Sequence, residues 1–116
     1  LNAEIAMELL KEEGFLIDWV KDGQECFDKL EESDEGYYDL ILMDIQMPIL
    51  NGYNTAAKIR QMENQKKAAT PIVAMTANSF DEDIERTKKA GMNGFIAKPL
   101  DSEKMFTILK QNIEKN

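Results

Sequence analysis

The sequence predicts an α/β fold of three layers, in which a doubly wound parallel sheet carries helices on both faces. Short apolar runs typical of strands buried on both faces alternate with amphipathic stretches at helical spacing. The chain has 116 residues, which suits one domain, residues 1–116, built around one core. Alternation of this kind favours parallel strands joined by right-handed crossovers. In such sheets ligands bind where the strands end, so the residues that follow each strand are the functional candidates.

Each expected element follows from the spacing of its apolar residues and from the residues that bound it. Helices are predicted where apolar side chains recur at helical spacing, and capping boxes at Asp22–Glu25 and Ser79–Glu82 mark two of their starts. Strands are predicted where β-branched and other large apolar residues lie between turn residues. In chain order we expect a helix over 2–13, a strand over 15–20, a helix from 22 to the acidic run 31–35, a strand over 39–44, a helix over 53–62, a polar linker over 66–70, a strand over 71–75, a helix from 79 to 91, a strand over 94–97 and a helix from 101.

Composition excludes several classes of function. Lys and Arg number 14 against 22 Asp and Glu, and a net charge of −8 argues against direct binding to nucleic acid. The chain has no histidine, which excludes histidine-based catalysis, histidine metal sites and a phosphohistidine carrier. No apolar run approaches the roughly 20 residues that cross a bilayer, so we expect no membrane contact.

The single cysteine, Cys26, indicates the compartment rather than a function. One cysteine forms neither an internal disulfide nor a zinc cluster, and its presence fits a reducing, cytoplasmic location. We expect Cys26 to fill the core, as do most of the seven methionines. Trp19 is expected to lie in the strand over 15–20 and to be covered by a helix.

Polar side chains follow three of the predicted strands: Asp44, Thr76 and Lys98. If these strands are parallel neighbours, a carboxylate, a hydroxyl and an ammonium group meet at one edge, a set that suits phosphate chemistry. A carboxylate can act as the nucleophile, and the other two groups can hold phosphoryl oxygens. Taken singly, each residue has a commoner explanation, namely a turn or helix cap, a strand-end threonine and a solvated lysine. What indicates a phosphate site is that all three residues follow successive predicted strands.

With these motifs the chain resembles the receiver domain of two-component response regulators, from its first helix to its last. The resemblance implies the flavodoxin-like receiver fold, and the wording of residues 43–48 and 75–78 is similar to receivers attached to hybrid sensor kinases. The residues that carry it are Asp39-Leu-Ile-Leu-Met-Asp44-Ile-Gln-Met47-Pro48, Asn51-Gly52, Pro71-Ile-Val-Ala-Met-Thr76-Ala77 and Ala90-Gly91-Met-Asn-Gly94-Phe95-Ile-Ala-Lys98-Pro99.

The resemblance implies a role for each site residue. Asp44 would be the phosphoacceptor, taking a phosphoryl group from a phosphohistidine of a histidine kinase or a histidine phosphotransfer domain. Lys98 and Thr76 would contact the phosphoryl group, together with the backbone N–H of Ala77. Thr76 and Phe95 would form the switch that changes the face built from the family's fourth helix, fifth strand and fifth helix. Such a domain is no enzyme toward an outside substrate and catalyses only its own aspartyl phosphorylation and dephosphorylation.

The resemblance also implies Mg²⁺, held by Asp44 and by the backbone carbonyl of Gln46. The family begins with a strand ending in two acidic residues that hold the ion, and this chain opens at Leu1 on what corresponds to the first helix. With no initiator methionine, we expect a fragment of a longer protein, and we expect metal binding and phosphorylation of the intact domain. The family's first strand is central in its sheet order 2-1-3-4-5. Its loss would expose an edge of residues 39–44, where a second copy could pair or residues 15–20 could close the gap.

Two other functions stay open at the level of sequence. The first is a pseudo-receiver, a protein-interaction module that is never phosphorylated, and the coding sequence upstream of Leu1 would discriminate it by showing whether the acidic pair exists. The second is a flavodoxin-like nucleotide binder, which shares the architecture. It ranks lower because the surroundings of Gly23 and Gly52 do not form a G-x-G-x-x-G run.

Overall fold

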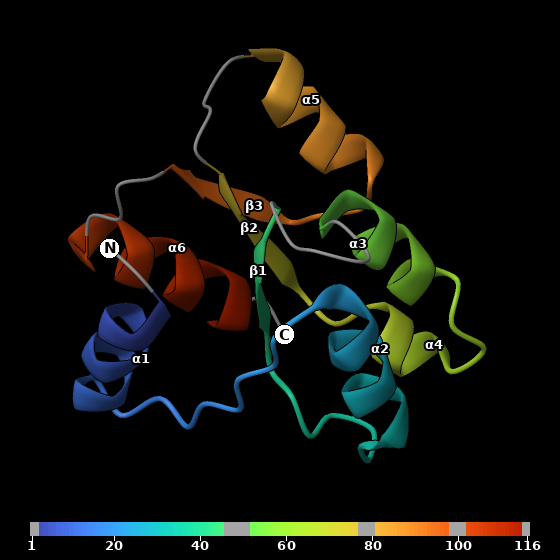
Figure 1. The fold of residues 1–116 in the computed structure, drawn as a ribbon, viewed down its shortest axis with the longest axis horizontal. Helices are drawn as coiled ribbons and strands as arrows, with labels where there is room; N and C mark the ends of the chain where they lie inside the picture. Colours follow the sequence, from blue (N-terminus) through green and yellow to red (C-terminus); the bar gives the residue numbers. More distant parts are fainter. Residues whose placement is uncertain (1–2, 46–51, 77–80, 98–101, 115–116) are drawn as a thin grey trace.

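A parallel sheet lies at the centre of the molecule (Figure 1). The computed structural model describes residues 3–45, 52–76, 81–97 and 102–114. Within them the sheet has three strands, β1 (Ile41–Asp44), β2 (Ile72–Thr76) and β3 (Gly94–Ala97), with β2 between the other two. These strands confirm the runs predicted over 39–44, 71–75 and 94–97, with boundaries that differ by one or two residues.

Helices cover both faces of this sheet, as the fold class predicted. Figure 1 shows α1 and α6 on one side of the strands, and α2, α3 and α4 on the other. The helix α5 stands at the end of the molecule toward which the strands point. The helices are α1 (Ala3–Glu12), α2 (Gly23–Glu32), α3 (Gly52–Arg60), α4 (Gln65–Ala68), α5 (Asp81–Lys89) and α6 (Ser102–Glu114).

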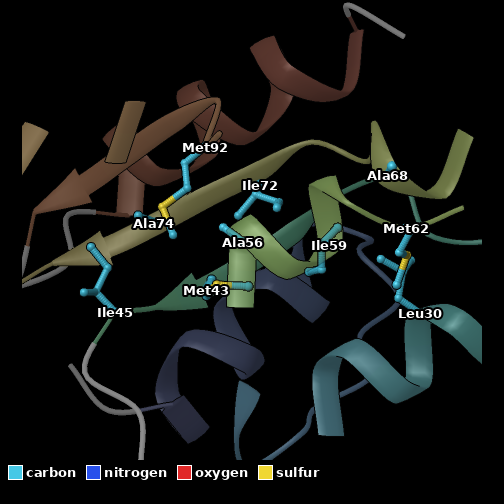
Figure 2. Packing of buried hydrophobic residues seen from close by; sticks show 10 residues of the cluster. All are labelled: Leu30, Met43, Ile45, Ala56, Ile59, Met62, Ala68, Ile72, Ala74 and Met92. Carbon is cyan, nitrogen blue, oxygen red and sulfur yellow. The ribbon is translucent and has the colours of Figure 1, made fainter. Parts of the chain in front are cut away.

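Two hydrophobic clusters join the layers, one on each face of the sheet. Successive side chains of a strand point to opposite faces, so neighbours in β2 divide between them. Ala74 packs toward α2 and α3, in the cluster shown in Figure 2, whereas Val73 packs toward α1 and α6. The first cluster comprises Leu30, Met43, Ile45, Ala56, Ile59, Met62, Ala68, Ile72, Ala74 and Met92, and the second Leu10, Val73, Ile96, Met105 and Leu109.

The strand predicted over residues 15–20 is wrong. These residues are extended but belong to no strand, and β1 pairs with β2 alone among the described residues. They therefore do not close against residues 39–44. A strand needs a neighbour to take its backbone hydrogen bonds, and no described strand lies beside them. Trp19 is 58% exposed and Leu16 fully exposed, so the expected helical cover over Trp19 is also absent.

Side-chain packing and hydrogen bonds hold this segment instead of strand pairing. Phe15 and Ile17 pack against the second cluster. The hydroxyl of Tyr38 donates a 2.6 Å hydrogen bond to Asp18, and burial, followed by that bond, raises the pKa of Tyr38. Phe15 and Ile17 are half-buried and Leu16 between them is exposed, so side chains alternate here without strand pairing.

One smaller expectation also needs correction, and the bounds expected for α2 are confirmed. The polar linker expected over 66–70 contains the short helix α4, because the side chain of Asn64 accepts hydrogen bonds from the backbone N–H groups of Lys66 and Lys67 at 3.1 Å. The helix α2 runs two residues into the acidic run, to Glu32. Its predicted start is confirmed, since Asp22 caps it by accepting from the backbone N–H of Glu25 at 2.8 Å.

Candidate functional site

Asp44 and Thr76 lie at the carboxyl ends of neighbouring parallel strands. The register sets Asp44 opposite Met75, so Thr76 lies one residue further along β2. Strands about 5 Å apart that rise about 3.3 Å per residue put the two Cα atoms roughly 6 Å apart. Asp44 is half-buried and Thr76 is buried, with 6% of its surface exposed. The sheet therefore brings a carboxylate and a hydroxyl together at the edge where α/β folds bind ligands.

Backbone hydrogen bonds fix the residue that follows Asp44 in the chain. The N–H of Ile45 donates to the carbonyl of Met75 at 3.1 Å, which continues the ladder beyond the strand. The N–H of Gly52, the first residue of α3, donates to the carbonyl of Ile45, also at 3.1 Å. A Cβ on Gly52 would lie 2.8 Å from the Cα of Ile45 and 3.1 Å from the carbonyl oxygen of Asp44. Only glycine lets α3 begin this close to the candidate phosphoacceptor.

Phe95 and Thr76 occupy neighbouring strands and the same face of the sheet. Phe95 pairs with Ala74, and Thr76 lies two residues after Ala74 in β2. Because side chains two residues apart in a strand share a face, Phe95 and Thr76 point to the same side of the sheet. The ring of Phe95 is half-buried and packs against the first cluster, the one that contains Ala74. This is the placement that the switch hypothesis requires, and the switching role itself stays a prediction.

Three further candidates, Gln46, Ala77 and Lys98, lie outside the described residues. Thr76 is the last residue before Ala77 in the chain, and Ala97, which pairs with Thr76, is the last before Lys98. Ala77 and Lys98 therefore follow directly in the chain from strand ends that the structure describes.

The described residues do not by themselves form a complete site for Mg²⁺. No group of three or more histidine, cysteine or acidic side chains comes together within the described ranges. Asp44 supplies the single carboxylate among the three described strand ends. Because Mg²⁺ demands six oxygen ligands in near-ideal octahedral geometry, one carboxylate is a ligand and not a site.

A family model described as the response regulator receiver domain matches residues 1–110. The chain belongs to this family. Among curated proteins, this receiver domain is 34% identical over 115 residues to hybrid signal transduction histidine kinase I of Dictyostelium discoideum, covering 97% of the chain and 7% of the relative. It is 39% identical over 114 residues to the osmosensing histidine protein kinase SLN1 of Saccharomyces cerevisiae, covering 96% and 9%. The chain spans less than a tenth of either relative.

Solved structures agree with the family. The receiver domain of a sensor histidine kinase from Pseudomonas aeruginosa is 34% identical, with a TM-score of 0.84 over 96% of this chain and 87% of that one, and it holds a magnesium ion in its active-site cleft. The chemotaxis protein CheY4 of Vibrio cholerae, at 24% identity and a TM-score of 0.81, covers 93% of this chain and 86% of its own, and it shares the fold. The receiver fold predicted from the motifs is therefore confirmed.

One contact beside the site was missed by sequence reasoning. The guanidinium of Arg86 in α5 lies 4.2 Å from the ring centre of Tyr53, in the first turn of α3. The two residues are 33 positions apart and belong to no motif used above, so only the folded arrangement shows the pair. The one hint in the sequence is the composition of α5, which contains a single aliphatic residue, Ile84.

Proposed function

We propose that this receiver domain accepts a phosphoryl group on Asp44 from a phosphohistidine of a histidine kinase or of a histidine phosphotransfer domain. The observation that carries the proposal is the register of β1 and β2, which brings Asp44 and Thr76 to one edge of the sheet. Relatives among hybrid histidine kinases support the choice of donor. A cytoplasmic setting in a phosphorelay is part of the proposal. No helix within the described ranges has the length and apolar character needed to span a bilayer.

In the proposed reaction a carboxylate oxygen of Asp44 attacks phosphorus. The new P–O bond forms as the P–N bond to the donor imidazole breaks, and the imidazole takes up a proton. The Thr76 hydroxyl donates a hydrogen bond to a phosphoryl oxygen, and Lys98 and the N–H of Ala77, placed there by the resemblance, offset the rest of its charge. Water later hydrolyses the acyl phosphate, so the domain catalyses only its own phosphorylation and dephosphorylation.

We include Mg²⁺ in this proposal as the cofactor of the intact domain. Asp44 and the backbone carbonyl of Gln46 would hold it together with acidic residues not found at this edge within the described ranges. When bound, the ion supplies positive charge that offsets the charge of the phosphoryl group. The magnesium ion in the Pseudomonas aeruginosa receiver supports this assignment.

The output of the proposed switch is a movement of Thr76 toward the phosphoryl group while Phe95 turns inward. The elements that correspond to the family's fourth helix, fifth strand and fifth helix are α5, β3 and α6, and we propose their surface as the output face. Self-association through the sheet is a further part of the proposal, since β1 has a strand neighbour on one side only within the described residues.

Phosphotransfer from a phosphorylated histidine phosphotransfer domain tests the function. The assay compares residues 1–116 with the domain extended by the coding sequence upstream of Leu1, in the presence of Mg²⁺. The extended domain should take up one acid-stable, hydroxylamine-sensitive phosphoryl group, and Asp44→Asn should abolish it. Asp39→Asn, at the exposed opposite end of the same run, is the matched control and should react normally. Equal labelling of Asp44→Asn would exclude the assignment, and no labelling of the unsubstituted extended domain would favour the pseudo-receiver.

A further inference from the structure

The helix α5 contributes no described side chain to either hydrophobic cluster. The other helices all contribute, for example Leu10 of α1 and Met105 of α6. Of the α5 side chains that the structure describes, Ile84 is half-buried, Thr87 is buried, and the remaining four are exposed. Because apolar burial is the main force that holds a helix on a domain, α5 depends on other contacts more than its neighbours do.

One end of α5 is firmly attached. The chain leaves the helix through Gly91, whose carbonyl accepts a 2.8 Å hydrogen bond from Nε of Arg60 in α3. The buried hydroxyl of Thr87 donates a hydrogen bond to the carbonyl of Ile84 within α5. This bond does not connect the helix to another element. The carboxyl end of α5 is therefore pinned, and its middle needs another contact to lie against the domain.

Besides the packing of α5 against β3, one contact there is the pair formed by Arg86 and Tyr53. The guanidinium lies 4.2 Å from the centre of the ring, within the range of an attractive cation–π interaction. The ring of Tyr53 is half-buried and packs against the first cluster, so it is a fixed platform, whereas Arg86 is exposed on the helix that needs holding.

Tyr53 is also connected to the site through the backbone. It follows Gly52, whose N–H bonds to the carbonyl of Ile45, and Ile45 follows Asp44. A continuous path thus runs from Asp44 through Ile45 and Gly52 to Tyr53 and across to Arg86. We propose that the Arg86–Tyr53 pair is a latch that holds α5 to the Asp44 end of β1 and so makes the position of α5 respond to the state of the site.

The contact that forms the latch is present in the unphosphorylated chain. Only its effect on phosphotransfer rests on the proposed function. Hydrogen exchange of the α5 amides tests the contact without any phosphorylation. Arg86→Gln removes the cation from an exposed helical position and should speed exchange of residues 84–90 about two- to fivefold, the range expected for an exposed cation–π pair. Arg86→Lys, which keeps a cation, should lie between Arg86→Gln and the unsubstituted chain.

Matched controls separate the latch from a general loss of stability. Tyr53→Phe keeps the ring and should keep the protection of α5. Lys58→Gln removes the other described cation–π pair, in which the Lys58 ammonium lies 4.4 Å from the centre of the Phe27 ring between α3 and α2, and it should leave α5 unchanged. Exchange in α6 serves as the internal reference in every variant, and exchange in α2 serves as a second reference in the Arg86 and Tyr53 variants.

Two results would overturn the latch. One is exchange in α5 that is the same for Arg86→Gln and the unsubstituted chain, and the other is an increase of equal size in α2 and α6. If the latch also regulates the site, Arg86→Gln should change the phosphotransfer rate of Asp44 in the extended domain, while Lys58→Gln should not. An exchange effect without labelling of Asp44 in any variant would contradict the proposed function and leave the latch standing.

Discussion

Asp44 and Thr76 end neighbouring parallel strands one residue out of register, which places a half-buried aspartate and a buried threonine at the same edge of the sheet. The arrangement follows from the backbone alone, because both residues belong to described strands whose pairing is continuous up to Asp44 and Met75. Thr76 is the one residue of β2 with a hydroxyl, and it lies at the end of the strand beside Asp44.

Removing the Thr76 hydroxyl should slow phosphotransfer. Thr76→Ala loses a hydrogen bond to a charged group, which is worth about 1.5–3 kcal/mol, so the rate should fall roughly 10- to 100-fold. Thr76→Ser keeps the hydroxyl and should stay within about threefold of the unsubstituted domain. Rapid-quench measurement of acyl phosphate formation checks both, and equal rates for the alanine and serine variants would remove Thr76 from the site.

Enlarging Gly52 should damage the site through the backbone. The new Cβ would meet the backbone of Ile45 and of Asp44, and backbone atoms cannot turn aside as a flexible side chain can. Gly52→Ala should therefore cost about 1–3 kcal/mol of unfolding free energy and lower the rate of Asp44 phosphorylation. Urea unfolding and the phosphotransfer assay measure the two effects.

Gly36 provides the control for that substitution. Its φ of +74° is left-handed, and a Cβ there would meet nothing within 4 Å. Gly36→Ala should cost about 1 kcal/mol through backbone strain and leave phosphotransfer unchanged. If both alanine variants transferred phosphate at the normal rate, the close approach at Gly52 would have no bearing on the site.

Arg60 should be one of the most sensitive positions for stability. Its guanidinium donates to the carbonyls of Gly91 at 2.8 Å, Ala68 at 2.6 Å and Thr70 at 2.7 Å, and to the side-chain oxygen of Asn93 at 2.8 Å. Burial lowers its pKa, and the partners are carbonyl oxygens rather than carboxylates. Arg60→Met removes the donor to all four oxygens, although the Asn93 oxygen keeps its bond from the N–H of Ile72. The substitution should cost about 2–4 kcal/mol of unfolding free energy.

A neighbouring cation on the same helix calibrates this prediction. Lys58 is exposed and makes a single described hydrogen bond, to the Gln24 side chain at 3.2 Å. Lys58→Met should cost less than about 1 kcal/mol. Equal losses of stability in the two methionine variants, measured by urea unfolding, would mean that the carbonyl contacts of Arg60 contribute nothing.

Cys26 should be unreactive in the folded chain and should make stability fall at alkaline pH. Burial raises its pKa from 9.0 to about 11, so the thiolate fraction near pH 8 is about a hundredfold lower than in the unfolded chain. The unfolded state releases its thiol proton first. The stabilising contribution is therefore fully present below pH 9 and is lost as the pH rises through about 11, up to about 3 kcal/mol.

Alkylation kinetics and pH-dependent unfolding test the two halves of that prediction. Iodoacetamide should label the native chain about a hundredfold more slowly than the urea-unfolded chain near pH 8. Cys26→Ala should reduce the loss of stability between pH 9 and 11 relative to the unsubstituted chain. Labelling at the same rate in both states would show that the thiol is not buried as described.

The sequence predicted the sheet well because the strands 41–44, 72–76 and 94–97 are apolar on both faces and bounded by turn residues. It failed at residues 15–20, which carry the same β-rich character. Local preference is alike in both cases, and what differs is whether a neighbouring strand takes the backbone hydrogen bonds. That partner is a tertiary feature, so the exposed Trp19 could not be predicted from the run itself.

The candidate site divides in a similar way. Asp44 and Thr76 were found because a polar residue directly after an apolar strand leaves a signal in the sequence. The Arg60–Gly91 bond and the Arg86–Tyr53 pair left none, because they join residues 31 and 33 positions apart through a helix end and a ring face. Long-range contacts of this kind depend on how the helices sit on the sheet, which the period of apolar residues does not determine.

Chemical trapping of the acyl phosphate is the most direct test that Asp44 is the phosphoacceptor. Borohydride reduces an aspartyl phosphate to homoserine, and peptide mapping locates the converted residue after phosphotransfer to the extended domain. We expect homoserine at position 44 and none at position 39 or in the Asp44→Asn variant. Homoserine at another aspartate, or labelling that survives Asp44→Asn, would contradict it.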